Sequence, residues 1–294
     1  MFTVFGATGH TGAVVADRLL AAGKPVRIVV RDAGKAGALA ARGAEVVTGD
    51  LTDRAVIARA LRGAEGAYLL APPDLQATDL IGRNRAIAEH YAAGLAAARV
   101  PHAVFLSSVG AQHATGIGPA VTNHHGEVAL RAVPGTVLTF VRAPGFMENL
   151  LGSAQAMKSD GILPVFGGGE THRFPMIATR DIGETAAAAL LGPRPSATRW
   201  IELRGPRDYS YADAAAIASR VLGRTVTATP LPLDAAVPAL TAAGFSPHVA
   251  GLFREMIEGA QRGLFSYEHP ESIVTGRVEL AEVLEQLVRY TETR

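Results

Sequence analysis

Short apolar segments alternate with longer amphipathic ones along the chain as far as residue 204. The short segments hold mainly β-branched and aromatic residues, which is typical of strands buried on both faces. The longer segments carry apolar residues at helical spacing. The expected strands are 2–5, 25–30, 45–48, 66–71, 102–106, 136–141 and 200–203, and the expected helices are 13–20, 33–42, 54–61, 79–99, 121–132 and 180–191. This alternation predicts an α/β protein with a doubly wound parallel sheet.

The pattern changes at residue 147, where we expect a second region to begin. Ser210 and Asp213 form a capping-box pattern that predicts the start of a helix. The further expected elements are helices at 147–159, 211–222, 234–243, 248–262 and 278–291, and strands at 162–166 and 225–229. We therefore expect a first domain at 1–150, with 178–204 returning to it, and a smaller, mainly C-terminal α/β lobe at 151–177 and 205–294.

Three glycines follow the first expected strand at a spacing of three, namely Gly6, Gly9 and Gly12. In a dinucleotide site the first allows a tight turn, the second lets the backbone approach the pyrophosphate, and the third lets the helix pack on the strand. The anion then meets free N–H groups at the positive end of the helix dipole. Thr8 and Thr11 are candidate hydroxyl donors. An ordinary turn could use such glycines, but their place between a strand and a helix favours a dinucleotide site.

The end of the second expected strand carries the residues that distinguish NAD from NADP. A carboxylate there binds the ribose 2′-hydroxyl of NAD, whereas an arginine accommodates the 2′-phosphate of NADP. Here Arg31 comes first, and Lys35 follows within reach of the same phosphate. We therefore expect NADP(H) to be preferred. NAD(H) stays an alternative, because Asp32 could bind the ribose while Arg31 points into solvent.

Ligands of a doubly wound sheet lie beyond the carboxyl ends of its strands. Asp50 and Leu51 follow the third expected strand and are placed to meet adenine, although Asp50 could instead only cap its turn. The residues that we expect at this edge are Gly6, Arg31, Asp50, Ala71, Pro72, Pro73, Ser107 and Ser108.

The charge and the composition limit the possible partners. The 294 residues carry 19% charged side chains and a net charge of +1, so nothing indicates a nucleic-acid surface and small molecules are the expected partners. The absence of cysteine excludes disulfides, thiol nucleophiles and thiolate metal sites. The first expected strand begins at residue 2, so we expect no leader, and no apolar run is long enough to span a bilayer. We expect a cytoplasmic monomer or homodimer without a membrane partner.

A set of motifs over nearly the whole chain carries a family resemblance. They are Gly6-Ala7-Thr8-Gly9-x-x-Gly12, Arg31 with Lys35, Gly49-Asp50-Leu51, Asn84, Phe105-Leu106-Ser107-Ser108-Val109, Glu127, Arg142, Gly145-Phe146, Glu148-Asn149, Arg180-Asp181-Ile182 and Val274-Thr275-Gly276-Arg277. The chain thus resembles the NmrA-like branch of the atypical short-chain dehydrogenases/reductases, and is most similar there to bacterial NAD(P)H:quinone reductases and triphenylmethane reductases.

The resemblance implies a Rossmann domain that binds NADP(H) and a smaller substrate-binding lobe, with residues 143–149 bordering the nicotinamide and the substrate. The cofactor contacts expected from the motifs and the resemblance together are Gly6, Thr8, Gly9, His10, Thr11, Gly12, Arg31, Lys35, Asp50, Leu51, Ala71, Pro72, Pro73, Ser107, Gly145 and Phe146. The expected substrate contacts are Phe146 and Asn149.

The sequence departs from ordinary short-chain dehydrogenases, which use a Tyr-x-x-x-Lys pair for proton transfer at a carbonyl oxygen. None of the three lysines, Lys24, Lys35 and Lys158, follows a tyrosine by four residues. The resemblance places residues 122–127 where the pair would lie, and this segment offers His124 and His125. These histidines and Ser108 are the candidate proton donors, with solvated side chains as the alternative for the histidines. We expect no metal site, because no third ligand stands at a recognisable spacing.

A quinone needs no dedicated acid, because hydride transfer to it leaves a phenolate that water can protonate. The sequence therefore favours an NADPH-dependent reductase of quinones or similar flat, electron-poor acceptors, in which positioning supplies most of the catalysis. The alternative from another class is an NADP(H)-binding redox sensor of NmrA type that catalyses nothing. An isomerase or a reductase of secondary metabolism also stays open.

Replacing Arg31 tests the expected phosphate contact. Arg31→Ala should weaken NADPH binding by about 1–3 kcal/mol, because a charge-assisted contact is lost. NADH binding should change far less, since NADH has no 2′-phosphate. Titrating the protein with both cofactors measures the two changes, and an equal loss for both would contradict the assignment.

Overall fold

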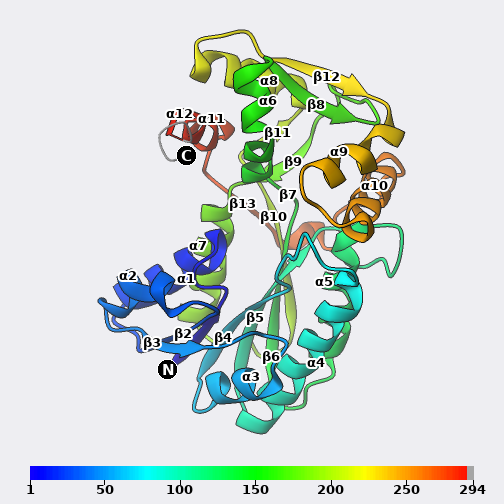
Figure 1. The fold of residues 1–294 in the computed structure, drawn as a ribbon. Coiled ribbons are helices and arrows are strands. Elements are labelled where there is room, and N and C mark those ends of the chain that lie inside the picture. The colour runs from blue at the N-terminus through cyan, green and yellow to red at the C-terminus, as the bar shows by residue number, and fades with distance from the viewer. Residues whose placement is uncertain (290–294) are drawn as a thin grey trace.

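The computed structural model describes residues 1–289, and its largest unit is an eight-stranded sheet in the order β13-β10-β6-β5-β4-β1-β2-β3 (Figure 1). All neighbouring strands in this sheet run parallel. The strands are β1 (Phe2–Phe5), β2 (Val26–Val30), β3 (Glu45–Thr48), β4 (Gly66–Leu70), β5 (His102–Ser108), β6 (Val137–Ala143), β10 (Arg199–Arg204) and β13 (Ile273–Thr275). The first six strands have the doubly wound order 3-2-1-4-5-6, which confirms the predicted fold class.

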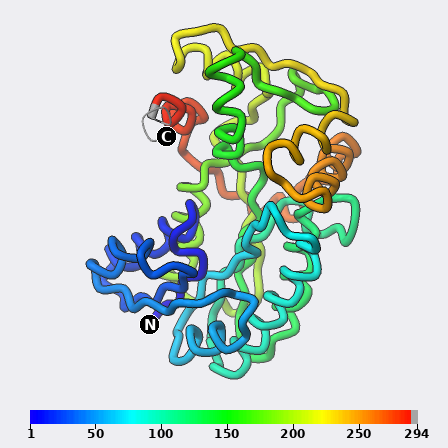
Figure 2. The backbone as a smooth tube through the Cα atoms, viewed as in Figure 1, coloured from blue at the N-terminus to red at the C-terminus, as the bar shows by residue number. Residues whose placement is uncertain are grey.

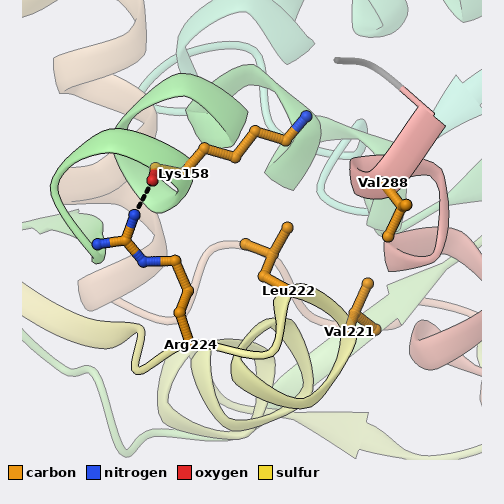
Figure 3. Close-up of a pocket in the computed structure, with 5 residues that line it drawn as sticks. All are labelled: Lys158, Val221, Leu222, Arg224 and Val288. Carbon is orange, nitrogen blue, oxygen red and sulfur yellow. Dashed lines mark hydrogen bonds between the residues drawn. The ribbon is translucent and has the colours of Figure 1, made fainter. Parts of the chain in front are cut away.

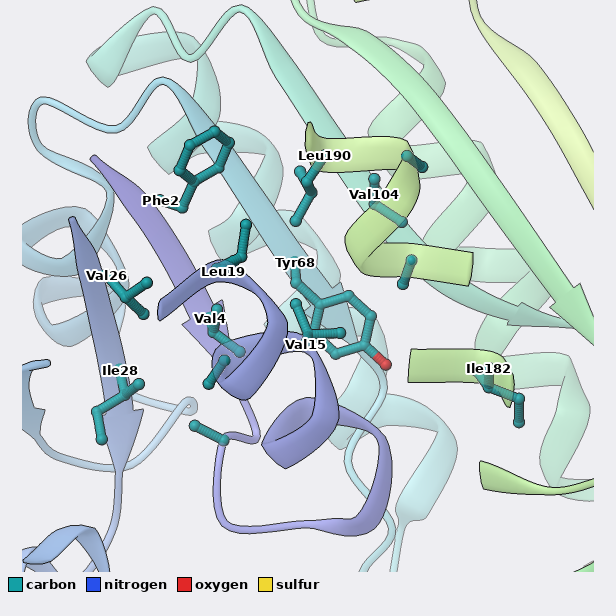
Figure 4. Close-up of a cluster of buried hydrophobic side chains, with 14 of the residues drawn as sticks. Phe2, Val4, Val15, Leu19, Val26, Ile28, Tyr68, Val104, Ile182 and Leu190 are labelled. Carbon is teal, nitrogen blue, oxygen red and sulfur yellow. The ribbon is translucent and has the colours of Figure 1, made fainter. Parts of the chain in front are cut away.

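Helices cover both faces of the large sheet. Helices α1 (His10–Ala21) and α7 (Thr179–Leu191) pack together on one face, and α3 (Arg54–Leu61), α4 (Leu80–Ala98) and α5 (Val121–Arg131) cover the other. The central strands contribute to two cores. Val4 of β1 lies in the cluster under α1 (Figure 4), and Phe5 lies in the cluster under α4. This double burial is why the strand sequences show no polar alternation.

The remaining elements form two small sheets with their own core. The sheets have the orders β11-β9-β7 and β12-β8, and α8, α6 and α11 pack with them around Met157, Ile217 and Leu284. These elements are β7 (Gly145–Phe146), η3 (Met147–Ser153), α6 (Ala154–Ser159), β8 (Ile162–Phe166), β9 (Phe174–Ile177), β11 (Asp208–Tyr209), α8 (Tyr211–Leu222), β12 (Thr227–Leu231), α11 (Leu280–Leu284) and α12 (Gln286–Arg289).

A helical hairpin completes the smaller region, with α9 (Ala236–Ala242) and α10 (Pro247–Gln261). The backbone trace in Figure 2 shows the chain leaving the large sheet, building this region and returning to the sheet before its last helices. We propose that 1–150 and 178–204 form one domain and that 151–177 and 205–294 form the smaller lobe, of which 290–294 lie outside the described residues. Residues 145–150 cross this division, because β7 pairs with β9 and Met147 and Leu150 lie in the core of the smaller region. Within the smaller lobe, β13 is a short return to the large sheet.

Several elements differ from the sequence expectation, and strands β7, β9, β11 and β13 were not expected. The expected helix at 33–42 is a 3₁₀ turn, η1 (Ala33–Ala36), followed by the short α2 (Gly37–Ala40), since Gly34 and Gly37 weaken a regular helix. The expected helix at 147–159 begins as the 3₁₀ segment η3. Strand β13 has only three residues, too few to show a pattern. The expected helix at 278–291 is observed as α11 and α12 as far as residue 289, and its last two residues lie outside the described part.

Asp181 fixes the return of the chain to the large sheet. Its Oδ2 accepts hydrogen bonds from the backbone N–H groups of Arg277 and Val278, both at 2.9 Å. A Cβ atom at Gly276 would lie only 2.5 Å from the same oxygen, so glycine is needed there. Two sequence motifs almost a hundred residues apart are therefore parts of one contact.

Removing the Asp181 carboxylate should destabilise the protein. Asp181→Ala leaves a buried N–H at Val278 without its partner, and we expect a loss of about 1–3 kcal/mol in the free energy of unfolding. The control is Asp17→Ala, which removes an exposed pair with Arg42 and should cost about 0–1 kcal/mol. Urea denaturation measures both, and equal losses would contradict this account.

Candidate cofactor and acceptor site

The candidate site lies where the strand order of the large sheet reverses. Strand β1 neighbours both β2 and β4, and the chain runs outward through β2 and β3 before it returns to β4. A crevice beyond the carboxyl ends of β1 and β4 is the usual ligand position in such sheets. The strand-end segments that follow β1, β2, β3, β4, β5 and β6 therefore share one edge.

The turn after β1 presents an open helix N-terminus. Gly6 has φ of +65°, which favours glycine, and the N–H of Gly9 donates to its carbonyl at 2.9 Å. No side chain caps α1, so the N–H groups of its first turn remain available to an anion. Thr8, Gly9 and His10 are all exposed at this point.

Gly9 and Gly12 face different surroundings. A Cβ atom at Gly9 would meet only the carbonyl oxygen of Gly6, at 3.3 Å, and otherwise open space. A Cβ atom at Gly12 would lie 2.2 Å from that same oxygen, inside the contact between helix and turn. Gly12 therefore serves the packing of α1, and Gly9 borders the space that a ligand would fill.

Thr8 and Thr11 are separated by the fold. Thr8 is exposed beside Gly9, whereas Thr11 is buried between α1 and β4 and its Oγ1 accepts a hydrogen bond from the Tyr68 hydroxyl at 2.9 Å. Burial raises the pKa of Tyr68 and outweighs the opposing effect of this hydrogen bond, so the hydroxyl stays neutral. The Thr11 side chain contributes to packing here, and Thr8 is the hydroxyl on the open side.

The residues after β2 leave two cations without partners. The Asp32 carboxylate accepts a hydrogen bond from the N–H of Gly34 at 2.9 Å and so caps η1. Arg31 and Lys35 are exposed, and within residues 1–289 neither side chain forms a hydrogen bond or an ion pair. This arrangement favours phosphate binding by the two cations over ribose binding by Asp32.

Asp50 closes the turn after β3, as the capping alternative predicts. Its Oδ1 accepts hydrogen bonds from the N–H of Thr52 at 2.8 Å and from the Thr52 hydroxyl at 2.7 Å. These bonds lower the pKa of Asp50, with smaller contributions from Arg83 and Arg31. No hydrogen bond to Oδ2 occurs within the described chain. Leu51 is half-buried against the core under α4.

The segment after β4 is held by the start of α4. The Asn84 side-chain amide donates to the carbonyl of Pro72 at 3.2 Å, which explains a motif residue that the sequence left without a role. Ala71 and Pro72 are half-buried and Pro73 is exposed, at the same edge as Gly6. The backbone of this segment is therefore fixed next to the candidate crevice.

The two serines at the end of β5 both donate to the protein itself. The Ser107 hydroxyl donates to Glu127 Oε1 at 2.6 Å in a buried contact, and the Ser108 hydroxyl donates to the carbonyl of Val109 at 2.9 Å. Neither serine is bonded to a histidine. Ser107 lies at the end of the strand, and its hydroxyl proton points to Glu127.

The two candidate histidines lie at the start of α5. His124 Nδ1 lies 2.9 Å from the carbonyl of Ala111, and His125 Nε2 lies 2.9 Å from Arg85. Burial, Arg85 and His124 lower the pKa of His125, which favours its neutral form. Each ring thus bonds a group other than Ser107. Within residues 1–289, no group of three His, Asp or Glu side chains is arranged to hold a metal ion.

The segment after β6 presents an open position. Gly145 is exposed, and a Cβ atom there would meet nothing within 4 Å. Phe146 packs against the core under α1, and Asn149 is exposed on η3. Glu148 accepts hydrogen bonds from the N–H and the hydroxyl of Thr179, at 2.9 and 2.6 Å, and so anchors this segment to α7.

A group of charged side chains, most of them buried, lies near Ser107. The sequence motifs included two of its members, Glu127 and Arg142. Arg142 on β6 donates to both oxygens of Glu127 at 2.8 Å and also contacts Glu202 at 3.5 Å and Glu268 at 2.5 Å. We call these four residues the Arg142 cluster. Burial lowers the pKa of Arg142, but the bonds and charges of Glu127 and Glu268 raise it by more, so the guanidinium stays charged. The signal in the sequence was a charged residue in or directly after an apolar strand segment, namely Glu202 within 200–203 and Arg142 after 136–141.

A pocket of about 280 Å³ lies elsewhere, among α6, α8 and α12 (Figure 3). Its lining residues are Lys158, Val221, Leu222, Arg224 and Val288. It shares no residue with the strand ends and is not a candidate for the cofactor. Separately, no helix within residues 1–289 has the length and apolar character needed to cross a membrane.

Substitutions at two glycines should separate ligand binding from folding. Gly9→Ala should lower NADPH affinity by at least about tenfold with little loss of stability, because its Cβ enters the open space. Gly12→Ala should instead reduce the free energy of unfolding by about 1–3 kcal/mol through overpacking. Fluorescence titration and thermal unfolding of both variants check this, and undiminished binding by Gly9→Ala would contradict the site.

The chain matches known proteins over most of its length. The model of the NmrA-like family matches residues 1–261. A (4-alkanoyl-5-oxo-2,5-dihydrofuran-3-yl)methyl phosphate reductase of Streptomyces griseus is 34% identical over 90% of this chain and 88% of that protein. An NAD(P)H azoreductase of Xenophilus azovorans is 31% identical over 87% of this chain and 86% of that protein.

Solved structures share the fold. The NADPH complex of the quinone oxidoreductase QOR2 of Escherichia coli has a TM-score of 0.81 at 24% identity, covering 98% of this chain and 100% of that chain. The NADP(H) complex of a Citrobacter triphenylmethane reductase has a TM-score of 0.78 at 20% identity, with 98% and 100% covered. With a family model matching 1–261 and two curated relatives above 30% identity, the chain belongs to the NmrA-like family.

Proposed function

We propose that this protein is an NADPH-dependent reductase that transfers hydride to a quinone or a similar flat, electron-poor acceptor. The observation that carries the proposal is the open N-terminus of α1 beside two unpaired cations, Arg31 and Lys35. The curated relatives above 30% identity are named as reductases, and one of them as NAD(P)H-dependent, which supports the same reading.

The arrangement of the strand ends fits an NADP(H) molecule in one orientation. The N–H groups of α1 would hold the pyrophosphate, and Arg31 with Lys35 would hold the 2′-phosphate. Asp50 and Leu51 would border the adenine, with the fixed backbone of Pro72 nearby. The other end of the cofactor would then reach Ser107 at the end of β5. The bound cofactor supplies the hydride.

The acceptor side has open space rather than a dedicated acid. Ser108, His124 and His125 each bond another part of the protein, namely Val109, Ala111 and Arg85. Such a site suits an acceptor that water can protonate after hydride transfer. We propose that Phe146 and Asn149 contact this acceptor beside the open position of Gly145. Positioning then supplies most of the catalysis.

The absence of cysteine and the nearly balanced charge fit a small-molecule enzyme of the cytoplasm. We propose that it acts there as a monomer or homodimer, without nucleic-acid or membrane partners.

The loss of reduced-nicotinamide absorbance tests the proposal. Purified protein should oxidise NADPH faster than NADH in the presence of a simple quinone, with a protein-free blank as the control. Parallel assays with an azo dye and a triphenylmethane dye distinguish the acceptor classes. NADPH binding without oxidation of any acceptor would overturn the reductase proposal and favour an NADP(H) sensor.

A further inference from the structure

The Arg142 cluster lies between the expected cofactor edge and the segment that follows α10. Arg142, Glu127 and Glu202 are almost fully buried, with side-chain exposures of 3%, 4% and 0%. Burying charges is costly unless each is well paired, so this cluster needs a function that outweighs its cost. The proposed hydride transfer uses none of the four residues directly.

Both oxygens of Glu127 are surrounded by donors. Oε1 accepts from Arg142 Nε at 2.8 Å and from Ser107 at 2.6 Å. Oε2 accepts from Arg142 Nη2 at 2.8 Å and from the indole N–H of Trp200 at 3.0 Å. The guanidinium and the indole can only donate. The carboxylate therefore fixes the Ser107 proton, and the Ser107 oxygen can only accept a further hydrogen bond.

Residues 264–269, which we call the 264–269 segment, contact the Arg142 guanidinium through Glu268. Glu268, whose side chain is 43% exposed, binds Arg142, and its N–H donates to Glu202 Oε1 at 3.1 Å. The carbonyl of Ser266 accepts from the Gln112 side chain at 2.9 Å. Gln112 belongs to the loop that follows Ser108.

The same loop packs against the 264–269 segment and α10. A Cβ atom at Gly110 would meet Phe265 at 3.0 Å, and the N–H of Gly116 donates to Glu255 on α10 at 2.7 Å. The loop thus has the end of β5 on one side and the smaller lobe on the other. A shift of the 264–269 segment would reach the loop through Gln112 and Phe265.

We propose that Glu127 and Glu268, both held by Arg142, are positioning residues: Glu127 makes Ser107 a pure hydrogen-bond acceptor for the cofactor, and Glu268 fixes the loop at 109–116 through the 264–269 segment. This inference rests on the proposed function. An acceptor-only oxygen at this strand end fits an N–H₂ donor, such as the carboxamide of a nicotinamide, and disfavours a carbonyl.

The Glu127 part is tested by a double-mutant cycle on NADPH affinity. In Glu127→Gln the new N–H₂ faces Ser107, because there it meets one obligatory donor, Arg142 Nε, whereas on the other side it would meet two, Arg142 Nη2 and Trp200. Ser107 then turns into a donor. Glu127→Gln and Ser107→Ala should each raise the Kd for NADPH about fivefold to tenfold, and the double variant should be no weaker than Ser107→Ala.

Two outcomes would overturn the Glu127 part. One is an unchanged Kd for NADPH in Glu127→Gln. The other is a double variant in which adding Glu127→Gln to Ser107→Ala raises the Kd as much as Glu127→Gln does alone. Thermal unfolding of every variant accompanies the titrations. If Glu127→Gln does not fold, Ser107→Thr replaces it, because a threonine hydroxyl can still donate to Glu127 and should keep the Kd within about twofold. A loss equal to that of Ser107→Ala would then overturn the assignment.

The Glu268 part is tested against a neighbour with the same charge. Glu268→Gln should increase hydrogen exchange of the 109–116 backbone in the protein without ligand, and should raise the KM for the acceptor about fivefold at an unchanged Kd for NADPH. Glu271→Gln, whose side chain is 75% exposed and lies 3.5 Å from His269 Nδ1, should change neither quantity. Equal exchange in the two variants would overturn the role of Glu268.

These measurements separate the two proposals. If the wild-type protein binds NADPH and reduces no acceptor, the reductase proposal is wrong. The double-mutant cycle on NADPH affinity and the hydrogen-exchange comparison would still test the positioning residues. The opposite outcome is wild-type turnover together with an unchanged Kd for NADPH in Glu127→Gln and unchanged hydrogen exchange in Glu268→Gln. It would support the reductase proposal and contradict the positioning proposal.

Discussion

The close contact of α1 with the turn after β1 is the constraint on which the rest of the structure depends. Only a residue without Cβ fits at Gly12, because the carbonyl oxygen of Gly6 occupies that space. Gly183 on α7 plays the matching part on the other side of α1, where a Cβ atom would lie 2.6 Å from Val14. With α1 held against both the sheet and α7, its N-terminus is fixed at the strand-order reversal, and the open space beside Gly9 follows from that placement.

Contacts between residues far apart in the chain attach the smaller lobe to the large sheet. Asp181 binds the backbone after β13, and Glu148 caps the start of α7 beside the open position of Gly145. Both contacts pair a carboxylate with backbone N–H groups, a combination that is strong and directional when buried. They hold residues 143–149 and 277–278 in one arrangement beside the candidate site.

The Arg142 cluster shows a different use of charge. One guanidinium on β6 faces three carboxyl groups, and hydrophobic residues of similar size would fill the buried part of this cluster at a lower energetic cost. Its geometry defines the direction of the Ser107 hydroxyl and brings the 264–269 segment to the end of β5.

The sequence by itself determined the glycine turn and most strands and helices of the first domain, the expected helix at 33–42 excepted, because strands buried on both faces and glycines between a strand and a helix leave strong local patterns. It also placed Arg31 near Lys35. Tertiary structure alone decided that Thr11 faces Tyr68 and that Asp181 binds the backbone of Arg277. It alone added β13 to the sheet and gathered Glu127, Glu202 and Glu268 around Arg142. These contacts join residues up to 126 positions apart, and no local pattern of polarity can specify which distant partner a buried charge or a short strand will meet.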